Sequence, residues 1–306
     1  MIGFGGRRSR GARAVVTGAG SGIGQAFAVE LAQRGGSVVC SDIDVDAAQR
    51  TVDAITDEGG KALALRCDVS ALAEVEALAD DARSWFGAPP SLVVNNAGVG
   101  AGGELVGQTP IEDWRWTLGI NLWGVIHGCH VFTPILREAG RGGIVNVSSA
   151  ASFGAAPRMA QYNVSKAGVL ALSETLAAEL AGSGVHVTVL CPTFVKTNIL
   201  SAGRITDESA GLAGTLMRVA GMSPARVVRT TLDVHDRGGL YVMPQLDAKV
   251  GWAVKRAAPR AYTQALGLLE RLGPLKPGTP ANGTATNIST NISTDISING
   301  STAEGR

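Results

Sequence analysis

A glycine-rich turn near the N-terminus constrains the fold of this chain more than any other feature. The apolar run at residues 14–17 precedes Gly18, Gly22 and Gly24, and an amphipathic stretch follows over residues 25–32. This order predicts a buried strand, a tight turn and a helix. Glycines let the backbone of such a turn approach a pyrophosphate, whose charge the helix N-terminus stabilises. An ordinary glycine-rich turn without a ligand is the alternative.

The rest of the chain continues this alternation of apolar β-branched runs and helical patterns. Strands are predicted over residues 13–17, 37–41, 61–66, 91–94, 143–148, 185–190 and 240–243. Helices are predicted over residues 22–34, 46–58, 71–85, 112–138 with a break near Gly119, 160–181 and 224–237. Such alternation favours an α/β fold, with a doubly wound parallel sheet of seven strands and helices on both faces. With 306 residues and 45% hydrophobic content, the chain is long enough to form one such domain.

Asp42 ends the second predicted strand, 24 residues after Gly18. A carboxylate near this offset accepts hydrogen bonds from the hydroxyls of an adenosine ribose and repels a 2′-phosphate. This role predicts NAD rather than NADP as the cofactor of the glycine-rich turn. The alternative is that Asp42, which has Asp44 and Asp46 beside it, caps the next helix.

Tyr162 and Lys166 are four residues apart in a predicted helix, so they share one helix face. A free tyrosine has a pKa of about 10, and a neighbouring cation lowers this pKa, which makes the phenol usable as a general acid or base. Ser149 follows the predicted strand 143–148, and the loop after it can bring the Ser149 hydroxyl within hydrogen-bond reach of the Tyr162 hydroxyl. The alternatives are a chance pair on a solvated helix face and a serine that serves only the turn.

With these residues, several short motifs make the chain resemble the short-chain dehydrogenase/reductase family. The motifs are Thr17 through Gly24, Cys67-Asp68-Val69, Asn95-Asn96-Ala97-Gly98, Asn121, Ser148-Ser149, Tyr162-x-x-x-Lys166 and Pro192 through Thr197. They stand in the family's order over about residues 10–245. The resemblance implies a Rossmann fold and an NAD(P)-dependent oxidoreductase. Thr193 departs from the family pattern, which usually has glycine there, and its bulk can re-aim the loop at the nicotinamide.

The resemblance also implies a role for each matching residue. Tyr162 exchanges a proton with the substrate oxygen, Lys166 lowers the tyrosine pKa and holds the nicotinamide ribose, and Ser149 hydrogen-bonds the substrate oxygen. Asn121, the fourth implied catalytic residue, positions a water that links Lys166 to solvent. Asp68 contacts the adenine, Asn95 and Gly98 the adenosine side, and Val195 and Thr197 the carboxamide. The implied cofactor-binding residues are Gly18, Ser21, Gly22, Ile23, Gly24, Asp42, Asp68, Val69, Asn95, Ala97, Gly98, Tyr162, Lys166, Pro192, Val195 and Thr197.

The predicted function is the interconversion of a secondary alcohol and its ketone, with hydride transfer to or from NAD. Residues 150–157 and a segment over 198–222, which covers the substrate in this family, are mostly apolar and hold no arginine cluster. These features predict an uncharged hydrophobic or aryl substrate. Residues 192–199 and 240–244 also resemble the benzylic alcohol dehydrogenases of lignin-fragment breakdown. Two other functions stay open: a catalytically idle dinucleotide sensor, and a membrane-surface protein that uses its C-terminal helices.

Composition argues against several other classes. The net charge of +1 gives no electrostatic basis for nucleic-acid binding, and no run of 18 apolar residues predicts a membrane span. We expect no signal peptide, because the first 11 residues lack an apolar core. Cys40, Cys67, Cys129 and Cys191 stand singly, without metal-ligand spacing, as reduced core residues do. We therefore expect no metal and a cytoplasmic location. We also expect a homodimer or homotetramer.

The chain divides into four predicted regions. A flexible N-terminal arm covers residues 1–11, the catalytic domain 12–246, a helical extension 247–273 and a disordered tail 274–306, which is rich in Gly, Thr, Asn and Ser. Pro259 divides the extension into two helices. The second helix places Tyr262, Leu266, Leu269 and Leu272 on one stripe. This stripe predicts a packed helix, or alternatively one that lies on a membrane surface.

Overall fold

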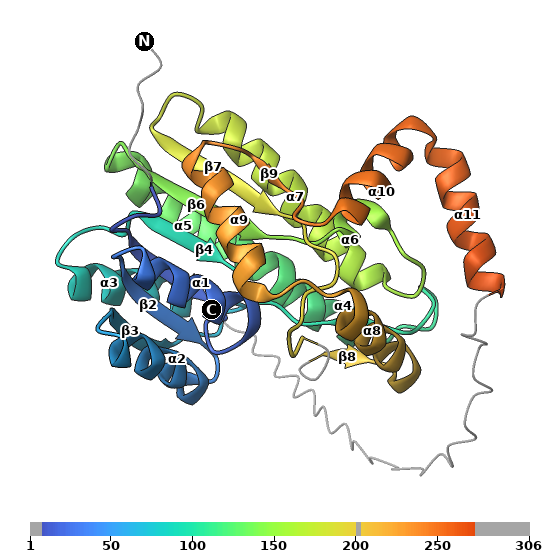
Figure 1. Ribbon diagram of the computed structural model, residues 1–306, viewed down its shortest axis with the longest axis horizontal. Helices are drawn as coiled ribbons and strands as arrows, with labels where there is room; N and C mark the ends of the chain where they lie inside the picture. The colour runs from blue at the N-terminus through green and yellow to red at the C-terminus, as the bar shows by residue number, and fades with distance from the viewer. Residues whose placement is uncertain (1–7, 200–202, 273–306) are drawn as a thin grey trace, which may run out of the picture. The chain divides into compact units, whose positions relative to one another are not determined.

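The computed structural model describes residues 8–199 and 203–272, and a parallel sheet forms its centre (Figure 1). The sheet has seven strands in the order β3-β2-β1-β4-β6-β7-β9. The strands are β1 (Arg13–Thr17), β2 (Ser37–Asp42), β3 (Lys61–Arg66), β4 (Leu92–Asn95), β6 (Gly142–Val147), β7 (Val185–Leu190) and β9 (Tyr241–Val242). The strand order reverses between β1 and β4, where sheets of this kind open a ligand crevice at the carboxyl ends of their strands. The predicted seven-stranded Rossmann fold is confirmed.

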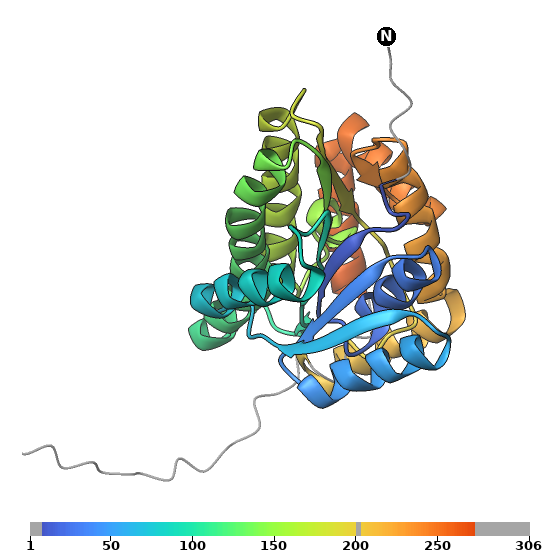
Figure 2. The same cartoon turned by 90° about the vertical axis from the view of Figure 1, so that its left-hand side faces the viewer.

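Helices cover both faces of this sheet (Figure 2). On one face lie α1 (Gly22–Gln33), α2 (Val45–Asp57) and α9 (Pro224–Asp236); on the other lie α3 (Leu72–Phe86), α5 (Gly124–Glu138) and α7 (Ala160–Glu179). Successive residues of a strand point to opposite faces, so Val16 packs in the core with Phe27 of α1, while Val15 packs in the core with Phe132 of α5. Because both faces are buried, the strands read as continuous apolar runs in the sequence.

The long helix predicted over residues 112–138 is divided where the sequence predicted a break. It consists of α4 (Ile111–Leu118), a π-helical turn η1 (Gly119–Trp123) and α5. Such a turn inserts one residue into the helical ladder and is frequent at functional sites. Here it carries Asn121, which is fully buried.

A second, very small sheet ties the segment 198–222 to the loop after β4. It pairs β5 (Ala101–Gly102) with β8 (Arg204–Ile205), and α8 (Asp207–Ala220) follows. Two hydrogen bonds flank this pairing, from Arg204 N to Gly100 O at 3.0 Å and from Thr206 N to Gly102 O at 3.2 Å. The sequence did not predict this sheet, because strands of two residues are too short to show a hydrophobic period.

The last part of the predicted flexible arm is ordered. Ser9 is fully buried, and its N–H and hydroxyl both donate to the Asp236 carboxylate, over 2.8 and 2.7 Å. Arg34 at the end of α1 donates in turn to the Ser9 hydroxyl. The prediction of a flexible arm is therefore wrong for residues 8–11, where polar partners from α1 and α9 hold the chain. Residues 1–7 lie outside the described residues, as does the tail over 274–306.

The extension forms α10 (Leu246–Ala257) and α11 (Pro259–Leu272), divided at Pro259 as predicted. The packing of α11 differs from the prediction. Leu269 and Leu272 are 65% and 75% exposed, whereas Tyr262, Leu266 and Glu270 are half-buried. These three residues are spaced four apart, so they lie on one face of the helix. This face, which has two polar residues and one leucine, packs against the domain, and the predicted leucine stripe does not. None of the described helices is long and apolar enough to cross a bilayer.

Candidate active site

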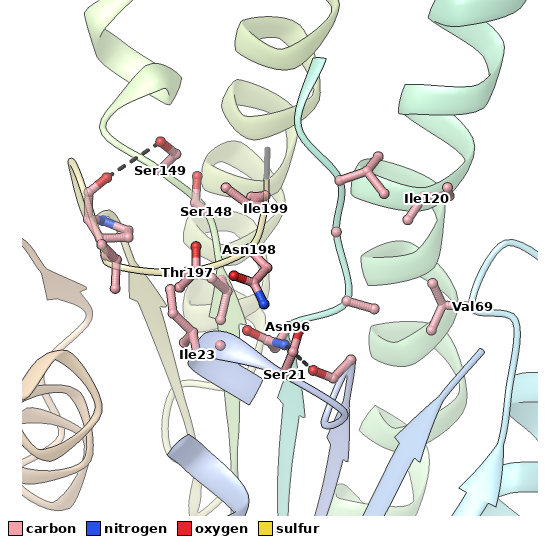
Figure 3. A pocket seen from close by; sticks show the side chains of 18 of the residues that line it. Ser21, Ile23, Val69, Asn96, Ile120, Ser148, Ser149, Thr197, Asn198 and Ile199 are labelled. Carbon is pink, nitrogen blue, oxygen red and sulfur yellow. Dashed lines mark hydrogen bonds between the residues drawn. The ribbon is translucent and has the colours of Figure 1, made fainter. Parts of the chain in front are cut away.

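A cavity of about 310 Å³ lies at the carboxyl ends of β1, β2, β4, β6 and β7 (Figure 3). Most of the predicted site residues line it: Gly18, Ser21, Gly22, Ile23, Asp42, Asp68, Val69, Ala97, Gly98, Ser149, Tyr162, Lys166, Pro192, Val195 and Thr197. The carboxyl ends of parallel strands share one edge of a sheet, which explains why residues so far apart in the sequence meet here. Three predicted residues lie outside the wall of the cavity, namely Gly24, Asn95 and Asn121.

The glycine-rich turn has the shape of a phosphate cradle. Gly18 and Gly22 have φ angles of +65° and +58°, which L side chains rarely adopt. A Cβ atom at Gly18 would lie 2.8 Å from the Ala97 Cα. Ser21 is the N-cap of α1, yet its side chain caps none of the first N–H groups of that helix. These N–H groups and the helix dipole favour an anion at the cavity wall, so the turn fits a dinucleotide pyrophosphate.

Gly24 acts on the shape of the turn and not on the cavity surface. A Cβ atom at Gly24 would overlap the Gly18 carbonyl. The Asn96 amide holds the same backbone, because its Nδ2 donates to Thr17 O over 2.9 Å and to Gly18 O over 3.1 Å. Thr17 Oγ1 accepts from the Asn96 N–H over 3.1 Å. The turn is thus braced from α1 and from the loop after β4.

Asn96 lines the cavity in place of its neighbour Asn95. Asn95 was predicted to contact the cofactor, but it is 2% exposed and its Nδ2 donates to Asn146 Oδ1 over 2.8 Å inside the sheet. Asn96, which was not predicted, lines the cavity (Figure 3). Asn95 is the last residue of β4, where both faces are buried, so its side chain is covered by α5. Only the residue after the strand end reaches the crevice.

Asp42 lines the cavity and does not cap α2. Its Oδ2 accepts from Gly20 N over 2.8 Å, and its Oδ1 accepts from Asp44 N over 3.1 Å. The cap of α2 is Asp44, whose side chain accepts from Ala47 N. The alternative of an Asp42 cap is therefore excluded. The Gly20 contact fixes the carboxylate beside the phosphate cradle, where a ribose would follow the pyrophosphate.

Lys166 lies under the catalytic end of the cavity. Its side chain is 3% exposed, and Nζ donates to Val147 O over 3.0 Å. Nζ lies 5.8 Å from the centre of the Tyr162 ring. Burial lowers the pKa of Lys166 to about 8, with a small opposing effect of Cys191. At neutral pH the side chain therefore stays mostly protonated and can act as the expected cation.

The pKa of Tyr162 is raised above its usual value of 10, against the prediction that Lys166 lowers it. The ring keeps part of its surface open to the cavity, but the protein around it desolvates the phenolate. The Ser149 hydroxyl opposes this effect and lowers the pKa. Lys166 directs its Nζ to a carbonyl instead of the phenol oxygen, so desolvation outweighs its charge.

Ser148 and Ser149 follow β6 and have different tasks (Figure 3). Ser148 donates to Lys166 O over 2.8 Å and so fixes the backbone of α7 to the sheet. Ser149 Oγ accepts from Ala151 N over 3.1 Å and donates to Pro192 O over 3.4 Å. The Pro192 bond is long, so the Ser149 hydroxyl can exchange it for a substrate oxygen.

The Asn121 side chain is occupied by the backbone of Val99. Its Oδ1 accepts from Val99 N over 2.8 Å, and its Nδ2 donates to Val99 O over 2.9 Å. The side chain therefore positions the loop after β4 and does not reach the cavity. This loop brings Gly98 next to Lys166, since a Cβ atom at Gly98 would lie 3.4 Å from Nζ. The predicted water next to Asn121 stays a prediction.

Thr193, the departure from the family pattern, is matched by the C-terminal extension. Its Oγ1 donates to Asp247 Oδ1 over 3.2 Å, and its N–H donates to Gln245 Oε1 over 3.3 Å. Gln245 also donates to Phe194 O over 3.1 Å. The added bulk thus contacts the start of α10, and the loop after β7 keeps Val195 and Thr197 at the cavity.

Several cavity residues were not among the predicted site residues. They are Ile43, Cys67, Asn96, Val99, Ile120, Val147, Ser148, Thr193, Asn198, Ile199 and Met217. Ile43, Asn96 and Ser148 stand next to predicted residues at strand ends, and this position could have indicated them. Val99 and Ile120 also adjoin predicted residues, but they do not stand at strand ends, and a loop and a helix bring them to the cavity.

Comparison with known proteins shows the family to which the chain belongs. The family model described as short chain dehydrogenase matches residues 12–207, which is more than half of the chain. The cyclohexanol dehydrogenase of Acinetobacter sp. is 38% identical over 188 residues, 61% of this chain and 74% of that protein. A probable oxidoreductase of Mycobacterium tuberculosis, EphD, is 42% identical over 187 residues. That match covers 61% of this chain but spans only 31% of the length of EphD.

A solved structure shows the same fold. It is a short-chain dehydrogenase/reductase from Burkholderia phymatum in complex with NAD, 34% identical in sequence, with a TM-score of 0.78. The likeness covers 83% of this chain and 96% of that one.

Proposed function

The chain belongs to the short-chain dehydrogenase family, and on that premise we propose that it interconverts a secondary alcohol and its ketone with NAD. The observation that carries this proposal is the meeting of Ser149, Tyr162 and Lys166 in one cavity with the glycine-rich turn and Asp42. A bound dinucleotide supplies the nicotinamide ring that accepts or donates the hydride.

In the direction of oxidation, the alcohol oxygen lies between the hydroxyls of Ser149 and Tyr162. Tyr162 accepts the proton of the alcohol hydroxyl while the hydride leaves the carbon that bears this hydroxyl and passes to the nicotinamide. Ser149 donates a hydrogen bond to the oxygen that becomes the carbonyl oxygen. Lys166 supplies positive charge behind the phenol. Reduction uses the same groups in reverse: Tyr162 donates its proton to the carbonyl oxygen as the hydride arrives.

The choice of NAD rests on Asp42. Its carboxylate lies at the cavity wall and is held by Gly20 N and Asp44 N, so it cannot easily turn away from a 2′-phosphate. A ribose with two free hydroxyls can donate to it instead. The NAD complex of the Burkholderia relative agrees with this choice.

The choice of a hydrophobic substrate rests on the catalytic end of the cavity. Ile199 and Met217 line the cavity, and no arginine does so among the described residues. An uncharged substrate avoids the desolvation that an unpaired carboxylate or phosphate would undergo there. The cyclohexanol dehydrogenase of Acinetobacter is named for such a secondary alcohol.

The test is a panel of alcohols and ketones, followed by absorbance of reduced nicotinamide with NAD and with NADP. We expect turnover of secondary alcohols such as cyclohexanol and 1-phenylethanol, with NAD preferred, and weak turnover of hydroxy acids. Cofactor binding is measured separately by fluorescence of the reduced form. Tight cofactor binding without turnover of any panel member would instead favour the idle dinucleotide sensor.

A further inference from the structure

Two side chains of the C-terminal extension cap the short helix that follows Ser149. This helix, α6 (Ala151–Gly154), ends with carbonyl groups that have no partner within so short a helix. Lys255 Nζ of α10 donates to Phe153 O over 2.6 Å. Tyr262 Oη of α11 donates to Gly154 O over 3.0 Å. Both carbonyls are therefore held from outside the sheet domain.

A third contact holds the strained backbone after α6. Ala155 and Arg158 have φ angles of +52° and +59°, the only positive values at non-glycine residues among those described. Each is disfavoured for an L residue and persists only where the surroundings impose it. Arg158 Nε pairs with Glu270 Oε1 of α11 over 2.5 Å, and both side chains are largely buried. The ion pair thus fixes the second strained position.

The segment between these contacts connects the two hydroxyls of the site. It begins directly after Ser149 and ends three residues before Tyr162. At its far end, Asn163 Nδ2 of α7 donates to Ala156 O over 2.7 Å. A change in this connection therefore changes the position of Ser149 relative to Tyr162. The extension lies beyond residues 12–207, so these contacts come from outside the matched part of the chain.

We infer that Lys255, Tyr262 and Glu270 are positioning residues of the active site: they hold residues 150–159 and so set the position of Ser149 relative to Tyr162. The inference rests on the proposed function for its catalytic consequence. The structural part, that α10 and α11 restrain this segment, stands without it. These contacts do more than support the fold, because the segment that they hold begins directly after Ser149. The Ser149 hydroxyl in turn affects the protonation of Tyr162.

The test uses the full chain with the double substitution Tyr262→Phe and Glu270→Met, which removes two polar contacts and keeps side-chain size. The matched control is Arg260→Gln with Arg271→Gln. Both arginines are exposed on the same helix and make no hydrogen bond or ion pair with a described residue. The readouts are hydrogen exchange of the peptide 150–160, kcat with its pH profile, and the dissociation constant of NAD.

In the double variant we expect faster exchange of the peptide and a kcat lower by about tenfold, since each lost hydrogen bond is worth a few-fold. The pH profile of alcohol oxidation should move to higher pH, because a displaced Ser149 hydroxyl lowers the pKa of Tyr162 less. Affinity for NAD and all readouts of the control should stay within about twofold of wild type.

Two results would overturn the inference. Unchanged exchange shows that the extension does not restrain the segment. Faster exchange with a wild-type kcat and pH profile shows that the restraint has no catalytic role. Failure of the proposed function has a different signature, because the wild-type chain then turns over no substrate while the exchange experiment still reports on the restraint.

Discussion

Protonation of Tyr162 is the residue-scale property on which the proposed chemistry depends. Burial raises its pKa, the Ser149 hydroxyl lowers it, and the Lys166 ammonium lies 5.8 Å from the ring centre. The deprotonated form needed for alcohol oxidation therefore becomes more abundant as the pH rises. The protonated form needed for ketone reduction is favoured at neutral pH, so the two directions should have opposite pH dependence.

Substitution of Tyr162 by Phe tests this residue directly. The ring and its packing stay, but the exchangeable proton is lost, so turnover should fall by roughly 10²–10⁴-fold. Affinity for NAD should change little. Steady-state kinetics and NADH fluorescence titration measure the two quantities. Near-normal turnover of the variant would show that another group transfers the proton.

Asp42 should determine the choice between the two cofactors. Asp42→Ser removes the negative charge next to the expected ribose and keeps a small polar side chain. We expect weaker binding of NAD and a narrower gap between the specificity constants for NAD and NADP. Both constants are measured with one alcohol at saturating concentration. A wild-type enzyme that uses NADP as well as NAD contradicts the role of Asp42.

His235 should make the folded state sensitive to acid. It is fully buried, and burial lowers its pKa from 6.5 to about 4. Between these two values the unfolded chain binds a proton that the folded chain does not, so the free energy of unfolding falls as the pH drops through this window. The full effect is about 3 kcal/mol.

Urea unfolding of wild type and His235→Gln at pH 4.5 and 7 measures this effect. The variant should lose less stability on acidification. The control is His130→Gln, because His130 is exposed. If wild type and His235→Gln lose the same free energy of unfolding between pH 7 and pH 4.5, another group causes the acid sensitivity.

At the scale of elements, close contacts fix the turn between β1 and α1. Gly24 faces the Gly18 carbonyl, and Asn96 holds the same carbonyl from the loop after β4. The turn can therefore accept no side chain at Gly24 without moving away from the position in which it lines the cavity.

Gly24→Ala should weaken NAD binding by at least about tenfold and destabilise the fold by about 1–3 kcal/mol, as inserted methyl groups do in tight sites. The control is Gly107→Ala, because a Cβ atom at Gly107 would have no neighbour within 4 Å. Isothermal titration with NAD and thermal unfolding measure both effects. Normal NAD affinity of Gly24→Ala would show that the turn does not bind the pyrophosphate.

At the scale of the whole chain, segments outside the matched residues complete the domain. Ser9 joins Arg34 and Asp236, which stand at the ends of α1 and α9. Ala248 is buried with Phe153 and Cys191, and Trp252 packs against this cluster. The extension therefore belongs to the core next to the active site, even though α11 exposes most of its own leucines.

Truncation separates the two C-terminal parts. Deletion of residues 277–306 should leave stability and turnover unchanged, since this composition supplies few apolar side chains. Deletion of residues 247–306 should destabilise the chain by at least about 2 kcal/mol through the loss of Trp252 and the contacts to α6. Chemical unfolding and size-exclusion chromatography measure the outcome. A soluble, fully active 1–246 fragment would contradict both the structural and the positioning role.

The sequence by itself determined the sheet and its helices, and the motifs of the family resemblance indicated most of the residues that line the cavity. Hydrophobic period and glycine spacing act over neighbouring residues, so they are visible in a single chain. Tertiary structure alone decided which of Asn95 and Asn96 reaches the cavity, because this depends on the residue at which β4 ends. It alone decided that the pKa of Tyr162 rises, since desolvation is a property of the surroundings and not of the Tyr-x-x-x-Lys spacing. Likewise, the contacts of Lys255, Tyr262 and Glu270 with residues 153–158 join positions about a hundred residues apart, and only the packing of α10 and α11 brings these side chains to the loop after Ser149.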